Sequence, residues 1–294
     1  MKKIRGAITA LVTPFTQKGE VDIAALGSLV QFQLSGGING IVPCGSTGEA
    51  VTLSLEEYSL VIKTVVAEVD GKIPVIAGAG SNDTQKAIYF SKLAKEAGAD
   101  GLLHVTPFYN KPTPNGLVAH FKAVADAVDL PIILYNVPGR TGSNVTAGVT
   151  LRIAREVAQV VGVKEASGDV VQMMEIVKNA SKDFSVFSGD DALALPLIGA
   201  GGDGCISVVS NEVPQEFAEL THAALEGDFI KAREMHFRLF DLMQVNFIET
   251  NPIPVKTALA MMGKVEEIFR LPLVPLEEKN RERLSAVLKG LDLL

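Results

Sequence analysis

A lysine interrupts an apolar run in the stretch "VVGVKEAS", where Lys164 follows residues 160–163. An amine at the end of a buried strand can form an imine with a carbonyl compound, provided that it is unprotonated. Apolar surroundings favour the uncharged form. Tyr135 ends a second apolar run, "PIILY", and its phenol could carry protons to and from such an imine. The two residues therefore suggest a lysine-dependent reaction of a carbonyl substrate.

Two further features could hold the anionic parts of such a substrate. In "GSTGEA", small residues leave backbone N–H groups free to bind a carboxylate, and Ser46 and Thr47 add hydroxyls. Arg140, in "NVPGRTG", could grip a carboxylate through two parallel hydrogen bonds. Each residue alone also suits an ordinary surface position, but together they fit imine chemistry on an oxoacid.

Short β-branched runs alternate with amphipathic helical stretches as far as about residue 225. The strands are expected within residues 6–14, 40–45, 73–80, 100–107, 130–138, 160–167, 184–191 and 203–210. Because parallel neighbours need helical crossovers, this order predicts an α/β fold, a (β/α)8 TIM barrel over residues 1–225. Residues 226–294 are expected to form a C-terminal helical extension. An open doubly wound sheet is the alternative. In a barrel, Lys164 and Tyr135 would meet at the carboxyl ends of neighbouring strands.

The composition narrows the possible partners. Of 294 residues, 47% are hydrophobic, and the net charge of −7 argues against binding nucleic acid or an anionic membrane. The two cysteines have no ligand spacing, which suits a reducing cytoplasm, and no apolar run reaches the roughly 20 residues that span a bilayer. The basic N-terminal segment is interrupted by Pro14 and is read as a first strand rather than a signal peptide.

Three tempting motifs are set aside, and no cofactor or metal ion is expected. "GAGGDG" at residues 199–204 follows a helical stretch and precedes a strand, the reverse of a dinucleotide fingerprint. "CGSTG" has Cys44 where a nucleophile elbow needs glycine. The histidines show no metal-ligand spacing: His104, His120, His222 and His236.

The motifs "CGSTGEA", "HVTPFYNKP", "LYNVPGRTG", "GVKEASGD" and "NPIPVK" occur in the order typical of one family. Over essentially its whole length the sequence resembles the dihydrodipicolinate synthase family of the class I pyruvate-dependent aldolases. The resemblance implies that Lys164 forms a Schiff base with pyruvate. The resulting enamine would attack the aldehyde of L-aspartate-4-semialdehyde, at the branch step toward diaminopimelate and lysine.

The resemblance also assigns roles to other residues. Tyr135 would move protons, with Thr47 linking it to Tyr109 of a neighbouring subunit. The backbone of Ser46 and Thr47 would hold the carboxylate of pyruvate. The remaining substrate contacts would be the side chain of Arg140 and the main-chain carbonyls of Gly189 and Ile206. Because Tyr109 would cross the tight dimer, a homo-oligomer is expected, a homotetramer built from two such dimers.

One departure from the family pattern keeps alternatives open. Ser46 stands where most members have threonine, and "GSTGE" also occurs in N-acetylneuraminate lyases. A lyase or a 2-keto-3-deoxy-sugar-acid aldolase is therefore the second reading, although those lyases lack "NPIPVK" and the arginine at position 140. A barrel that binds a ligand without catalysis is the third.

Inhibition by lysine is expected to be weak or absent. In lysine-sensitive relatives the inhibitor contacts an acidic residue, two histidines and a tyrosine, at the positions held here by Lys86, Tyr58, Leu55 and Phe108. The cationic Lys86 should repel the amino groups of lysine.

Overall fold

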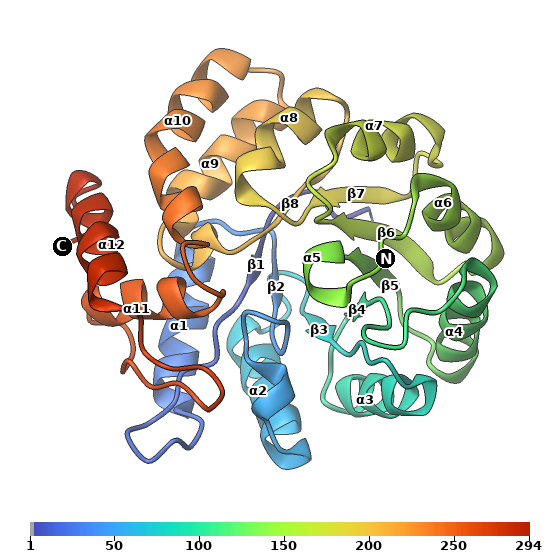
Figure 1. Ribbon diagram of the computed structural model, residues 1–294, viewed down its shortest axis with the longest axis horizontal. Helices are drawn as coiled ribbons and strands as arrows, with labels where there is room; N and C mark the ends of the chain where they lie inside the picture. The colour runs from blue at the N-terminus through green and yellow to red at the C-terminus, as the bar shows by residue number, and fades with distance from the viewer. Residues whose placement is uncertain (1–2) are drawn as a thin grey trace.

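The computed structural model describes residues 3–294, which form a barrel of eight parallel strands ringed by helices (Figure 1). The predicted (β/α)8 fold is confirmed, with strands shorter than expected because the runs continue into loops at the strand ends. The strands are β1 (Gly6–Ala10), β2 (Gly40–Val42), β3 (Ile76–Gly78), β4 (Gly101–Val105), β5 (Ile132–Asn136), β6 (Val160–Glu165), β7 (Ser185–Ser188) and β8 (Gly204–Ser207).

The sheet closes on itself. Its hydrogen-bonded order is β2-β1-β8-β7-β6-β5-β4-β3, and a parallel bridge between Ile41 and Val75 joins the two end strands. The Ile41 N–H donates to the carbonyl of Pro74 at 3.0 Å, and the Gly78 N–H donates to that of Pro43 at 3.0 Å. A closed ring leaves no exposed strand edge and brings all eight carboxyl ends to one mouth.

Helices connect the strands in the order that the sequence predicts. Those of the barrel are α1 (Ile23–Ser35), α2 (Leu55–Val69), α3 (Thr84–Glu96), α4 (Pro114–Ala127), α5 (Pro138–Thr141), α6 (Ala147–Glu156), α7 (Val170–Asn179), α8 (Ala194–Gly199) and α9 (Pro214–Leu225). Short 3-10 turns lie at Ala50–Thr52, Asp191–Leu193 and Val209–Asn211. Side-chain hydrogen bonds cap the N-termini of several of these helices. At α2, for example, Ser54 and Glu57 form a reciprocal capping box.

Alternate side chains of the strands point into the barrel or out toward the helices. The inward-facing cluster includes Ile8, Val42, Ile133, Tyr135 and Phe187. The larger outer cluster packs the other strand faces against the helices. The barrel is therefore filled by side chains, and enzymes with this fold carry their active sites at the mouth.

Residues 199–204, the "GAGGDG" stretch, form the end of α8 and the turn into β8. Gly201 adopts a φ of +98°, a left-handed conformation that favours glycine. The interpretation of this stretch as a helix end and turn is confirmed.

Three helices follow the barrel: α10 (Phe229–Val245), α11 (Ile253–Met261) and α12 (Glu278–Gly290), grouped on one side of the ring in Figure 1. Their apolar side chains share a cluster with strand residues, so that Leu239 and Leu284 belong with Ala7 and Cys205. The extension is thus built onto the barrel, and a domain boundary at residue 225 stays a prediction. Within residues 3–294, no helix is both long and apolar enough to cross a membrane.

A buried acid lies just before α9, against the end of α10. Glu212 is 1% exposed, and Asn246 Nδ2 donates to its Oε2 at 2.6 Å. Within residues 3–294, Glu212 Oε1 and Asn246 Oδ1 have no hydrogen-bond partner. Burial raises the pKa of Glu212 well above its ordinary value of 4.5. The folded state therefore holds this proton more tightly, and the stability that it contributes is lost as the pH rises from 4.5 through the raised value.

Glu212→Gln should stabilise the fold at pH 8, because the new amide can donate to Asn246 Oδ1 and no buried charge remains. We expect a gain of about 1 to 3 kcal/mol at pH 8 and little change at pH 4. Denaturant unfolding at both pH values measures this, with the half-buried Glu219→Gln on α9 as the control. Destabilisation of the Glu212→Gln variant at pH 8 would contradict the account.

Candidate active site

Lys164 and Tyr135 meet inside the barrel mouth. The two residues are register partners on β6 and β5, and they are 5% and 7% exposed. Lys164 Nζ lies 4.4 Å from the centroid of the Tyr135 ring. The lysine is therefore a buried amine against a phenol, rather than a surface residue that extends into water.

Gly189 makes room for the stem of this lysine. It follows β7, and a Cβ added to it would lie 3.0 Å from Lys164 Cε and 2.6 Å from Ala166 Cβ. Any side chain here would displace the amine. Ile206, on β8, is fully buried in the inward-facing cluster. Gly189 thus follows β7, the neighbour of β6 in the ring, and Ile206 lies on β8, one strand further on.

A buried polar network lies behind the pair. The next residues along the two strands, Asn136 and Glu165, are again register partners, and Asn136 Nδ2 donates to both carboxylate oxygens at 2.9 and 3.1 Å. Gln172 Nε2 and the Ser167 N–H donate at 3.1 and 2.7 Å. These bonds fix the strand register that sets Lys164 against Tyr135. Sequence reasoning missed them, although polar residues beside both site residues were the available signal.

The loop after β2 has the form expected of an anion-binding turn. The N–H groups of Gly48 and Glu49 donate to the carbonyls of Gly45 and Ser46 at 3.1 and 3.2 Å. Among the residues that the structure describes, nothing accepts a hydrogen bond from the Ser46 or Thr47 N–H. Ser46 is exposed and Thr47 is 3% exposed. Two adjacent donors are therefore free to bind a carboxylate.

Asn251 ties this loop to Arg140, and sequence reasoning missed it. Its Nδ2 donates to Thr47 Oγ1 at 3.0 Å, while its carbonyl accepts from Arg140 Nη2 at 2.9 Å. Arg140 lies on α5, directly after β5, and is exposed. The segment before α11 thus brings the serine–threonine loop and the guanidinium to one side of the mouth. The only sequence signal was the motif "NPIPVK".

Tyr109, unlike the buried Lys164, is exposed at the surface. It lies in the loop after β4, is 89% exposed and adopts a φ of +71°. This conformation is uncommon for a residue with a side chain and costs about 1 to 3 kcal/mol.

The residues expected to decide lysine sensitivity differ in burial. Tyr58 is 2% exposed, and its hydroxyl donates to the Gly78 carbonyl at 2.9 Å. Lys86 is exposed on α3, Leu55 is exposed at the start of α2, and Phe108 is half-buried. The Tyr58 hydroxyl is thus already hydrogen-bonded to β3, whereas the charged side chain of Lys86 is exposed to solvent.

Burial makes two histidines and one cysteine unsuited to acid–base or nucleophilic chemistry. Burial lowers the pKa of His104 to about 3 and that of His120 to about 4, so both rings are neutral at pH 7. Burial raises the pKa of the Cys44 thiol, which makes it a poor nucleophile. In the described part of the chain, no group of three or more histidine, cysteine or acidic side chains could hold a metal ion.

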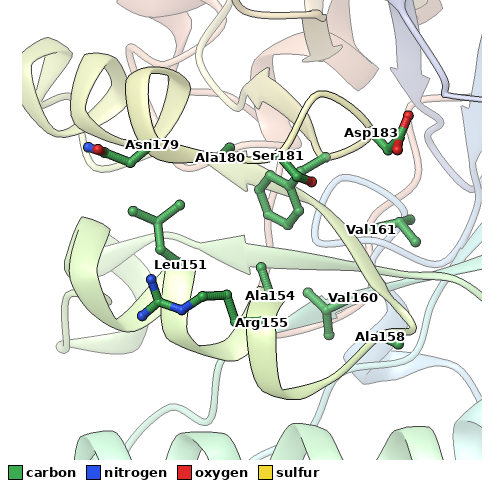
Figure 2. Close-up of a pocket in the computed structure, with 11 residues that line it drawn as sticks. Leu151, Ala154, Arg155, Ala158, Val160, Val161, Asn179, Ala180, Ser181 and Asp183 are labelled. Atoms are coloured by element: carbon green, nitrogen blue, oxygen red, sulfur yellow. The ribbon is translucent and has the colours of Figure 1, made fainter.

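A cavity of about 320 Å³ lies at the opposite end of β6 (Figure 2). It is lined by Leu151 and Arg155 of α6, by Val160 at the start of β6 and by the segment after α7. Because Lys164 is near the carboxyl end of the same strand, this hollow is separate from the site.

Known proteins are similar to this chain in sequence and in architecture. A family model for the dihydrodipicolinate synthetase family matches residues 3–291. A 4-hydroxy-tetrahydrodipicolinate synthase of Maridesulfovibrio salexigens is 53% identical and covers 99% of each chain. A chloride-inhibited dihydrodipicolinate synthase of Acinetobacter baumannii, solved with pyruvate, is 44% identical and superposes with a TM-score of 0.97, over 99% of this chain and 100% of that chain.

A further solved structure is described as the first monomeric dihydrodipicolinate synthase variant. It is 47% identical, superposes with a TM-score of 0.97 and covers 99% of this chain and 98% of that chain. On the match over residues 3–291 and on these identities, the chain belongs to the dihydrodipicolinate synthetase family.

Proposed function

We propose that the chain is an enzyme with the 4-hydroxy-tetrahydrodipicolinate synthase activity, a lyase-type condensation of pyruvate with L-aspartate-4-semialdehyde. The observation that carries the proposal is the buried Lys164 amine, 4.4 Å from the centre of the Tyr135 ring in a barrel of this family. Pyruvate bound to the Acinetobacter baumannii relative supports the first substrate.

Imine formation begins with pyruvate held by its carboxylate on the Ser46 and Thr47 N–H groups. Lys164 Nζ attacks the keto carbon, and loss of one water from the adduct leaves the imine. Tyr135 supplies a proton to the departing oxygen and then accepts one from the methyl group, which gives the enamine. Because Thr47 Oγ1 accepts from Asn251, its own proton remains free to donate toward this relay.

Carbon–carbon bond formation uses the second substrate. Arg140 binds the carboxylate of the semialdehyde, the enamine carbon attacks the aldehyde, and the aldehyde oxygen gains a proton to become a hydroxyl. The amino group of the semialdehyde then attacks the imine carbon and expels Lys164. The ring closes, and the free amine is restored.

We place this reaction in the cytoplasm and in a homo-oligomer. Both cysteines, Cys44 and Cys205, are free, which suits a reducing compartment. Apolar side chains are exposed between the loop after β2 and the start of α2, with Val51 at 91% and Leu55 at 41% exposed. Such a patch favours a dimer in which Tyr109 enters the partner's mouth. A tetramer would pair two of these dimers.

Lys164→Arg should abolish the reaction, because a guanidinium cannot form the imine. We expect a loss of roughly a thousandfold or more in an assay with both substrates. Reduction with borohydride in the presence of pyruvate should add one pyruvate-derived group to Lys164, as read by peptide mass spectrometry. Lys178→Arg, exposed on α7, is the control. Labelling of another lysine, or faster turnover of N-acetylneuraminate, would contradict the assignment.

Tyr109→Phe should lower kcat because the phenol is lost, and mixing subunits tests its origin. A mixed dimer of Tyr109→Phe and Lys164→Arg chains contains one complete site if Tyr109 crosses the interface. Random pairing at equal amounts should then restore about a quarter of the parent activity. Complementation is measured after co-refolding or co-expression. No recovery in verified mixed dimers would show that each chain uses its own Tyr109.

Lysine should not inhibit the enzyme at millimolar concentration, because Lys86 repels a cation at the position where sensitive relatives have an acid. Initial rates with both substrates near their KM values, over a lysine titration, check this. The Lys86→Glu variant tests whether charge at this position matters. Strong inhibition of the parent enzyme would refute the prediction.

A further inference from the structure

A fully buried ion pair joins the serine–threonine loop, residues 45–49, to the helical extension. Glu49, the last residue of the loop after Gly45, is 2% exposed, and Lys256 on α11 is completely buried. Lys256 Nζ donates to Glu49 Oε1 at 2.6 Å. The ammonium also lies 4.1 Å from the centre of the Phe15 ring and 5.3 Å from that of Phe269. The cation is thus enclosed by one carboxylate and two aromatic faces.

Stability is a weak reason for such a pair. Removing two charges from water costs several kcal/mol per ion, and apolar replacements of buried pairs are often as stable or more stable. Burial lowers the pKa of Lys256 to about 8 even though Glu49 favours the charged form. Because burying Lys256 and Glu49 is costly, the ion pair is better explained by the residues that it holds in position.

The pair acts on the residues that face the substrate. Glu49 adopts a φ of +52°, and its N–H donates to the carbonyl of Ser46 at 3.2 Å, so its position is coupled to the turn. Two residues earlier, Thr47 is held by Asn251, five positions before Lys256. The extension therefore grips the loop at both residues 47 and 49, on either side of Gly48.

We propose that Lys256 and Glu49 are positioning residues that hold the Ser46 and Thr47 N–H groups in the geometry that receives the pyruvate carboxylate. The inference rests on the proposed function. Lys256 itself does not contact substrate, because the carboxylate and the two rings enclose its amine. Since a displacement of about 1 Å can cost roughly a hundredfold in rate, a relaxed loop should weaken pyruvate use specifically.

The double variant Glu49→Gln with Lys256→Met removes both charges and leaves no lone buried ion. It should melt within a few degrees of the parent, while the KM for pyruvate rises roughly tenfold and the KM for the semialdehyde changes little. The matched control is Glu267→Gln with Arg281→Met, which removes a half-buried pair of 2.7 Å elsewhere in the extension. The control should leave both KM values unchanged.

A second variant covers failure of the first to fold. Glu49→Asp keeps the charge and tolerates positive φ, but shortens the reach to Lys256. It should raise the pyruvate concentration needed for borohydride trapping on Lys164 by at least about threefold. Unchanged pyruvate dependence in either folded variant would overturn the inference. If the parent itself traps no pyruvate on Lys164, the proposed function fails instead.

Discussion

The site depends on the register between β5 and β6. Tyr135 is opposite Lys164, and one residue further on Asn136 is opposite Glu165. Because successive side chains of a strand point to opposite faces, a slip of one residue would turn the amine out of the mouth. The hydrogen bonds of Asn136 and Gln172 to Glu165 secure the register from the outer face. On the inner face, the absence of a side chain at Gly189 leaves space for the aliphatic part of Lys164.

The helical extension holds the loops at the barrel mouth in place. A barrel mouth is built from loops, and loops hold geometry poorly unless other groups bind them. Here Asn251 holds Thr47 and Arg140, and Lys256 holds Glu49. Arg270 adds a third anchor, donating to the Thr52 carbonyl at 2.8 Å and to Glu57 Oε2 at 2.7 Å. Three residues of the extension thus fix the loop and turn that follow β2.

The sequence predicted the repeating architecture and the reactive pair, because both are local signals. Alternating strand and helix patterns imply parallel pairing, and the end of an apolar strand marks the mouth. It did not reveal Asn251 or Lys256 as partners of the loop, since those contacts span 204 and 207 residues and carry no local pattern. Tyr109 is exposed, and the sequence alone offers no local signal for its surroundings. Gly189 was assigned to the site only through the family resemblance. The structure supplies the physical reason, because a side chain at this position would collide with Lys164.

The central claim is that Lys164 is the amine that binds the ketoacid. A crystal structure of the enzyme soaked with pyruvate tests it most directly. We expect continuous electron density from Lys164 Nζ to the second carbon of pyruvate, with the carboxylate on the Ser46 and Thr47 N–H groups. Pyruvate bound without a covalent link, or a lysine side chain directed away from it, would contradict the account.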